Sequence, residues 1–234
     1  MTQRLPGIAI SRRSLFWAGG LAGLLLALTT LATLIRSQPN SAIENTVMEW
    51  IQGWSAPGLS TLMRDVSIWT DTEIRIALPV LAITYLVFSG QAQRGWSVAI
   101  ALAVIAAAAL GFDYGLGQIV ERGRPIAEST GSSFPSGHTF GSTVLFGFIA
   151  ILAIKHNLRL SLRVPLVLLM AALIVLVGIS RVFLAAHWPT DVAAGYLLGA
   201  ILLLLLMPLY KTCVQVICDE GDDKPGGARR ARTS

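Results

Sequence analysis

Residues 164–210 read VPLVLLMAALIVLVGISRVFLAAHWPTDVAAGYLLGAILLLLLMPLY, two apolar runs joined by a short polar stretch. Each run holds about 20 residues, which is the length that an α-helix needs to cross the hydrocarbon core of a bilayer. The stretch between them contains an arginine, a histidine and an aspartate, and such groups are costly near lipid. The pattern therefore predicts a transmembrane helical hairpin with a polar site at its turn.

The composition of the whole chain places it in the same class. Of its 234 residues, 54% are hydrophobic and 13% are charged, whereas a water-soluble domain carries about 25% charged residues. We therefore predict an all-α, polytopic membrane protein built as a bundle of six transmembrane helices. The six predicted spans are residues 14–35, 74–89, 96–120, 139–154, 164–183 and 190–210.

Basic residues at the ends of these spans predict the orientation of the chain. An even number of spans puts both termini on one side, and the excess of lysine and arginine marks that side as cytoplasmic. The residues that carry this signal are Arg4, Arg12, Arg13, Arg94, Lys155, Arg159, Arg163, Lys211, Arg229, Arg230 and Arg232. The net charge of +5 thus reflects membrane topology and not nucleic-acid binding. We expect the protein to lie in the cytoplasmic (inner) membrane of a bacterium.

The N-terminal segment admits two interpretations. Residues 11–16 read SRRSLF and precede an apolar run, as in a twin-arginine export signal. No clear small-residue cleavage site follows, and the run is long enough to span. The favoured interpretation is that Arg12 and Arg13 are cytoplasmic anchors of the first transmembrane helix.

The first outer loop, residues 36–73, is predicted to contain interfacial helices. Ser41 and Glu44 form the S-x-x-E pattern of a capping box, and apolar residues then recur at helical spacing through Trp54. A second short helix is expected to run to Trp69. The pair could be a packed cap over the bundle or a gate that admits lipid. The predicted membrane domain is residues 1–215, followed by a disordered cytoplasmic tail, residues 216–234.

The polar turn between the last two spans contains the residues that a histidine nucleophile needs. His187 and Asp191 are four residues apart, and Pro189 suits the first turn of a helix. We expect the Asp191 carboxylate to accept a hydrogen bond from one imidazole nitrogen, which leaves the other free for attack.

Complementary groups precede the fourth span and follow the third. Gly137 allows close approach to an anion, Ser136 offers a hydroxyl, and His138 can act as a general acid. The helix that starts here also presents its amide donors and positive dipole end. Arg124 and Arg181 carry guanidinium forks that match phosphate oxygens. Together these groups predict a phosphoryl-transfer site without a metal ion.

These clusters resemble the three-part signature of the type 2 phosphatidic acid phosphatase (PAP2) superfamily, K-x6-R-P, P-S-G-H and S-R-x5-H-x3-D. Residues 135–138 and 180–191 match the last two motifs at every fixed position. The resemblance covers about residues 113–191 and implies a metal-independent phosphatase without a cofactor. It implies that His187 forms a phosphohistidine, that Asp191 orients it, and that His138 protonates the leaving alcohol and then activates water. The phosphate cradle implied by the resemblance comprises Arg124, Ser136, Gly137 and Arg181.

One position departs from the family pattern. The lysine of the first motif would fall at Gly117, so one donor of the cradle is missing. Arg122, two residues before Arg124, is the predicted substitute and therefore a further phosphate-binding candidate. Otherwise, the activity is weaker or the substrate carries a different charge.

The predicted function is that of an integral membrane lipid phosphatase or diphosphatase. Its substrate could be undecaprenyl diphosphate, another polyprenyl phosphate, phosphatidate, phosphatidylglycerol phosphate or a lipid A phosphate. Two alternatives stay open: a catalytically weak protein that binds or transports lipid phosphates, and a phosphotransferase that uses an alcohol acceptor. The predicted partners are the membrane and the lipid substrate, with no nucleic acid or protein partner.

Overall fold

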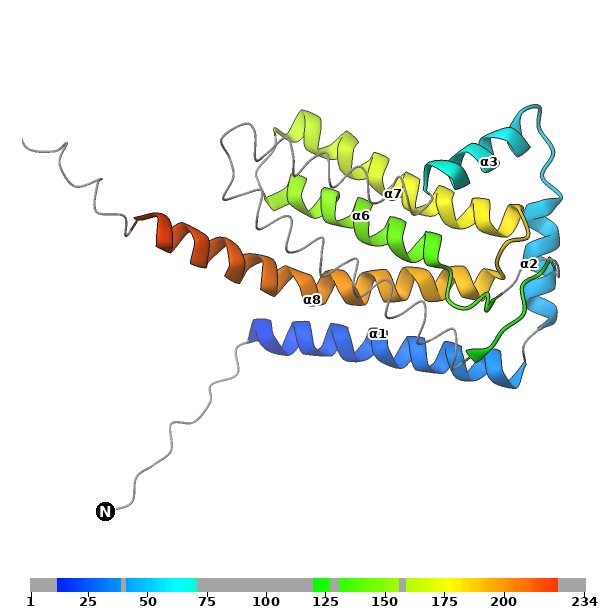
Figure 1. The fold of residues 1–234 in the computed structure, drawn as a ribbon, viewed down its shortest axis with the longest axis horizontal. Helices are drawn as coiled ribbons and strands as arrows, with labels where there is room; N and C mark the ends of the chain where they lie inside the picture. Colours follow the sequence, from blue (N-terminus) through cyan, green and yellow to red (C-terminus); the bar gives the residue numbers. More distant parts are fainter. Residues whose placement is uncertain (1–11, 39–40, 71–119, 127–130, 156–158, 223–234) are drawn as a thin grey trace, which may run out of the picture.

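The computed structural model describes residues 12–38, 41–70, 120–126, 131–155 and 159–222, and the regular elements in these ranges are all helices. They are α1 (Arg12–Ser37), α2 (Ala42–Gln52), α3 (Leu59–Trp69), α6 (Gly137–Lys155), α7 (Leu160–Phe183) and α8 (Pro189–Asp222). Figure 1 shows α1, α6, α7 and α8 running alongside one another, while α2 lies across one end of them. The all-α prediction is confirmed for this part of the chain.

Four of the described helices contain segments long and apolar enough to cross a membrane. These segments are Trp17–Ser37, Gly137–Lys155, Leu160–Phe183 and Pro189–Met207. They coincide with four of the six predicted spans, and a protein with several membrane spans is thereby supported. The predicted spans 74–89 and 96–120 lie outside the described residues, apart from residue 120.

Small residues let α8 pack closely against α6, which lies between α7 and α8. A Cβ atom at Gly195 would lie 2.9 Å from the carbonyl oxygen of Ser136, and one at Gly199 would lie 2.6 Å from Cβ of Thr143. Small residues have this role in membrane helices, because lipid supplies no hydrophobic drive for association and backbones must approach to gain dispersion contacts. The packing brings the first turns of α6 and α8 together.

The first outer loop folds as the two predicted helices, and α2 is capped as expected at its start. The Ser41 hydroxyl accepts the Glu44 N–H at 3.3 Å. Ile51 of α2 packs against Val182 of α7 and Val192 of α8. Helix α2 therefore covers the ends of α7 and α8, as a packed cap does. A gating role for this loop stays a prediction.

Helix α8 extends into the predicted tail, residues 216–234, whose disorder stays a prediction. Helix α8 continues through Asp222, so residues 216–222 are helical. Residues 209–220 contain neither proline nor glycine, so this stretch carries no helix-breaking residue. Residues 223–234 lie outside the described part of the chain.

Candidate active site

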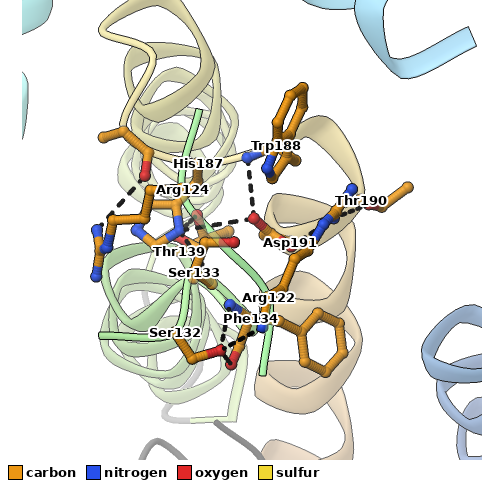
Figure 2. A network of polar contacts seen from close by, with 12 residues as sticks. Arg122, Arg124, Ser132, Ser133, Phe134, Thr139, His187, Trp188, Thr190 and Asp191 are labelled. Carbon is orange, nitrogen blue, oxygen red and sulfur yellow. Dashed lines mark hydrogen bonds and ion pairs between the residues drawn. The ribbon is translucent and has the colours of Figure 1, made fainter. Parts of the chain in front are cut away.

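The three motif segments meet at the end of the bundle that α2 covers. Residues 120–126 lie beside residues 131–136, since the Ser133 N–H donates to the Arg122 carbonyl at 2.7 Å. The Ser136 N–H donates to the carbonyl of Asp191 at 3.1 Å, which ties the start of α6 to the first turn of α8. The predicted convergence of motifs distant in sequence is therefore present in the described residues (Figure 2).

His187 is held by a backbone carbonyl and not by the expected carboxylate. Its side chain is buried, with Nδ1 2.8 Å from the carbonyl oxygen of Ser133 and 4.0 Å from Oδ2 of Asp191. A carbonyl can only accept, so Nδ1 carries the proton and Nε2 is the nitrogen with a free lone pair. The predicted hydrogen bond from His187 to Asp191 is thus replaced by one to Ser133, while Asp191 remains an electrostatic neighbour.

The position of Asp191 in α8 explains this difference. Asp191 is the third residue of the helix, and its Oδ2 accepts the Trp188 N–H at 2.9 Å. A carboxylate at this position commonly reaches back to the residue that precedes the helix, because that N–H has no partner within the helix. The other oxygen, Oδ1, lies 2.7 Å from Nη1 of Arg122. Both oxygens of this fully buried group are therefore engaged.

Two arginines lie within electrostatic reach of His187. The pKa of His187 is lowered from 6.5 to about 3, mainly because the side chain is buried and also because of the positive charges of Arg181 and Arg124. The imidazole is therefore neutral near neutral pH and can act as a nucleophile. Nε of Arg124 is buried without a hydrogen-bond partner among the described residues. Such an atom is costly unless a ligand pairs with it, which fits a phosphate contact.

The predicted general acid, His138, lies within electrostatic reach of His187. His138 is the second residue of α6, and when it is protonated its charge also lowers the pKa of His187. Ser136 is fully buried just before that helix, and its hydroxyl oxygen accepts a hydrogen bond from the Thr139 hydroxyl at 3.0 Å. The structure thus brings both histidines, both arginines and the N-terminus of α6 to one site.

Arg122 has partners that the sequence did not suggest. Its guanidinium is buried, with Nη2 2.5 Å from Oε2 of Glu44 and Nη1 2.7 Å from both Oδ1 of Asp191 and the hydroxyl of Thr190. These contacts favour a role in holding carboxylates over the predicted role in binding phosphate. The Arg122 guanidinium also lies 5.2 Å from the Trp188 ring.

Glu44 and Ser133 are the site residues that sequence reasoning missed. Glu44 had a signal, because it completed a capping pattern, but that pattern pointed to Ser41 and not to Arg122. Ser133 binds His187 through its backbone carbonyl. Every residue type carries this group, so the sequence could not reveal the contact. Gly117 lies outside the described residues, so the departure there has no structural account.

Comparison with known proteins identifies the class that this fold and site define. Residues 98–215 match the family model described as the PAP2 superfamily. The chain therefore belongs to the PAP2 superfamily, as a homologue of bacterial membrane lipid phosphatases.

Two curated relatives and one solved structure refine the comparison. The chain is 41% identical over 83 residues to phosphatidylglycerophosphatase B of Bacillus subtilis strain 168, a match that covers 35% of this chain and 41% of that protein. It is 29% identical over 156 residues to "Putative undecaprenyl-diphosphatase YbjG" of Escherichia coli K12, covering 63% of this chain and 73% of that protein. The crystal structure of a transmembrane PAP2 type phosphatidylglycerolphosphate phosphatase from Bacillus subtilis aligns with a TM-score of 0.68 and 26% identity, over 82% of this chain and 96% of that one.

Proposed function

We propose that this protein hydrolyses a phosphate monoester or diphosphate of a membrane lipid through a phosphohistidine at His187. The observation that carries the proposal is the state of that side chain. Its imidazole is neutral and its Nδ1–H donates to the carbonyl of Ser133, while the positive charges of Arg181 and Arg124 help to lower its pKa. Membership of the PAP2 superfamily supports the same conclusion.

In the first step, Nε2 of His187 attacks phosphorus and the bond from phosphorus to the leaving oxygen breaks. His138, in its protonated form, gives its proton to that oxygen, so that an alcohol or a lipid monophosphate departs. The imidazole of His187 becomes positively charged as the nitrogen–phosphorus bond forms. The nearby Asp191 carboxylate, 4.0 Å from Nδ1, stabilises that charge.

In the second step, His138 acts as a general base. It removes a proton from water, the oxygen attacks phosphorus, and the nitrogen–phosphorus bond breaks to release inorganic phosphate. His187 returns to its neutral form and His138 to its protonated form. The cycle closes without a net change in either side chain.

The phosphate oxygens are proposed to lie between the arginines and the start of α6. Arg124 and Arg181 supply guanidinium donors, and the Ser136 hydroxyl is a further donor next to the positive dipole end of α6, which begins at Gly137. Charge develops on these oxygens during transfer, so donors fixed in advance lower the barrier. Arg122 is proposed to act outside this cradle, because its contacts are carboxylates.

The substrate class is proposed from the relatives. One is named for phosphatidylglycerophosphate and the other for undecaprenyl diphosphate, and both molecules place a phosphate at the surface of a lipid bilayer. The site lies at the end of the helices opposite to Lys155 and Arg159. By the positive-inside rule, that end would face the exterior of a cytoplasmic membrane.

The test measures phosphate release by purified protein in lipid nanodiscs, with phosphatidylglycerophosphate, phosphatidate and undecaprenyl diphosphate as separate substrates. We expect His187→Ala to abolish turnover with at least one active substrate. His156→Ala is the matched control, since His156 is the third histidine of the chain and lies outside the motifs.

Three results would contradict the proposal. Full turnover by His187→Ala would show that the reaction does not proceed through a phosphohistidine at this residue. Tight binding of lipid phosphates without release would favour the binding or transport protein. Transfer to an added alcohol in preference to water would favour the phosphotransferase.

A further inference from the structure

Glu44 is a buried carboxylate outside the family motifs. It lies in the first turn of α2 and is 4% exposed. Its Oε2 contacts Nη2 of Arg122 at 2.5 Å, and its Oε1 accepts the N–H of Thr190 at 3.3 Å and also its hydroxyl. A buried charge is retained only where it is paired and hydrogen-bonded, so these contacts explain how Glu44 persists there.

The contacts make Arg122 a bridge between two carboxylates. Its Nη2 faces Glu44 and its Nη1 faces Asp191. A planar guanidinium held at both nitrogens cannot rotate away from either partner without breaking an ion pair in a buried setting. The orientation of Arg122, and with it the position of the Asp191 carboxylate, therefore depends on Glu44.

The charges in this group suit the proposed chemistry. One guanidinium and two carboxylates carry a net charge of −1 beside His187. Without Glu44, Arg122 would neutralise Asp191 in full. With Glu44 present, negative charge remains to stabilise the imidazolium that forms when His187 takes the phosphoryl group.

We propose that Glu44 is a positioning residue for the reaction: through Arg122 it holds Asp191 beside His187 and supplies the negative charge that Arg122 would otherwise cancel. The inference rests on the proposed function of His187. It also gives α2 a place in catalysis, because a helix of the first outer loop contributes one end of the network. Glu44 itself does not touch substrate.

The test compares Glu44→Gln with Glu49→Gln in single-turnover experiments, which follow formation of the phosphohistidine with labelled substrate. Glu49 is an exposed glutamate of the same helix and is the matched control. We expect Glu44→Gln to lower the rate constant of phosphohistidine formation by about 10- to 100-fold, as loss of supporting contacts does elsewhere. KM and the amplitude should stay close to wild type, as should all values for Glu49→Gln.

The amplitude separates positioning from folding. A loss of folded protein would lower the amplitude and leave the rate constant unchanged, and that result would overturn the inference. So would an unchanged rate constant in Glu44→Gln. If the wild-type protein itself formed no phosphohistidine, the proposed function would fail, and this inference would fail with it.

A double-mutant cycle tests the route through Arg122. If Glu44 acts through this arginine, Glu44→Gln should have a much smaller effect on the rate constant in an Arg122→Gln background than in wild type. Equal effects in both backgrounds would overturn the route. Thermal melting of all variants shows whether the comparison is made on folded protein.

Discussion

A methyl group added at Gly195 is expected to part α6 from α8 at the level of the active site. Its Cβ would lie 2.9 Å from the carbonyl oxygen of Ser136 and from Cβ of Thr139, and 3.1 Å from the amide nitrogen of Phe140. Two of these three atoms are backbone, so no rotamer change removes the overlap. The helices must move instead.

The size of the movement follows from the contact distances. Ordinary van der Waals contact begins at 3.4 Å, so the helices must separate by about half an ångström, since close-packed interiors transmit such overlap. Overpacking of this kind costs roughly 1–3 kcal/mol of stability. Because a misplacement of 1 Å can cost roughly 100-fold in rate, half of it predicts a loss of about 10-fold in kcat.

The loss in rate is expected because Gly195 lies one turn after Asp191 on α8, and Ser136 lies beside His138 at the start of α6. Gly195→Ala therefore moves the predicted nucleophile pair relative to the predicted acid. The assay is phosphate release by purified protein in nanodiscs, together with the midpoint of thermal melting.

The control is the same substitution in α1. At Gly23 a Cβ meets no described atom within 4 Å, and alanine is a better helix former than glycine by roughly 0.5–1 kcal/mol. Gly23→Ala should therefore keep the activity and keep or raise the melting temperature. Wild-type kcat and melting in Gly195→Ala would refute the close-packing argument.

Two further predictions concern charge. The pKa of His187 is about 3 in the folded protein and 6.5 when unperturbed, so the unfolded chain takes up this proton first and the stability should fall as the pH drops from 6.5 towards 3. Thermal melting of His187→Gln should lack this part of the loss. An identical pH dependence of melting in both proteins would contradict the burial of a neutral imidazole. Gly117→Lys should lower KM for the lipid phosphate by restoring the donor of the first motif, and an unchanged KM in phosphate-release kinetics would indicate that position 117 does not face the phosphate.

The membrane spans were predictable from sequence because their cause is simple. A helix that crosses hydrocarbon must be apolar over a fixed length, and the four described spans satisfy that requirement in the predicted places. Their ends were less accurate. Helix α7 begins at Leu160 and not near Val164, and α8 runs to Asp222, because helices extend beyond the bilayer wherever the backbone permits.

The candidate site was predictable only where its side chains are of types that are rare next to hydrocarbon. Imidazole, guanidinium and carboxylate groups next to hydrocarbon need a reason to be there, which singled out His187, Asp191 and Arg124. Their pairing was a different matter. The sequence shows that His187 and Asp191 are four residues apart, but not that Asp191 turns back to the Trp188 N–H and leaves Ser133 to bind the imidazole.

The same limit applies to Arg122, whose partners are distant in sequence. The sequence predicts Arg122 as the substitute for the missing lysine because it lies two residues before Arg124, yet one of its partners is Glu44, 78 residues away. A cation that looks available in sequence is bound by an anion that looked like a helix cap. Since each charge in a buried site must be paired, the partner of an arginine determines whether it can serve a phosphate. The carboxylate contacts of Arg122 therefore support the proposal that this arginine acts on the side of Asp191 and His187, while the phosphate cradle of Arg124 and Arg181 stays a proposal.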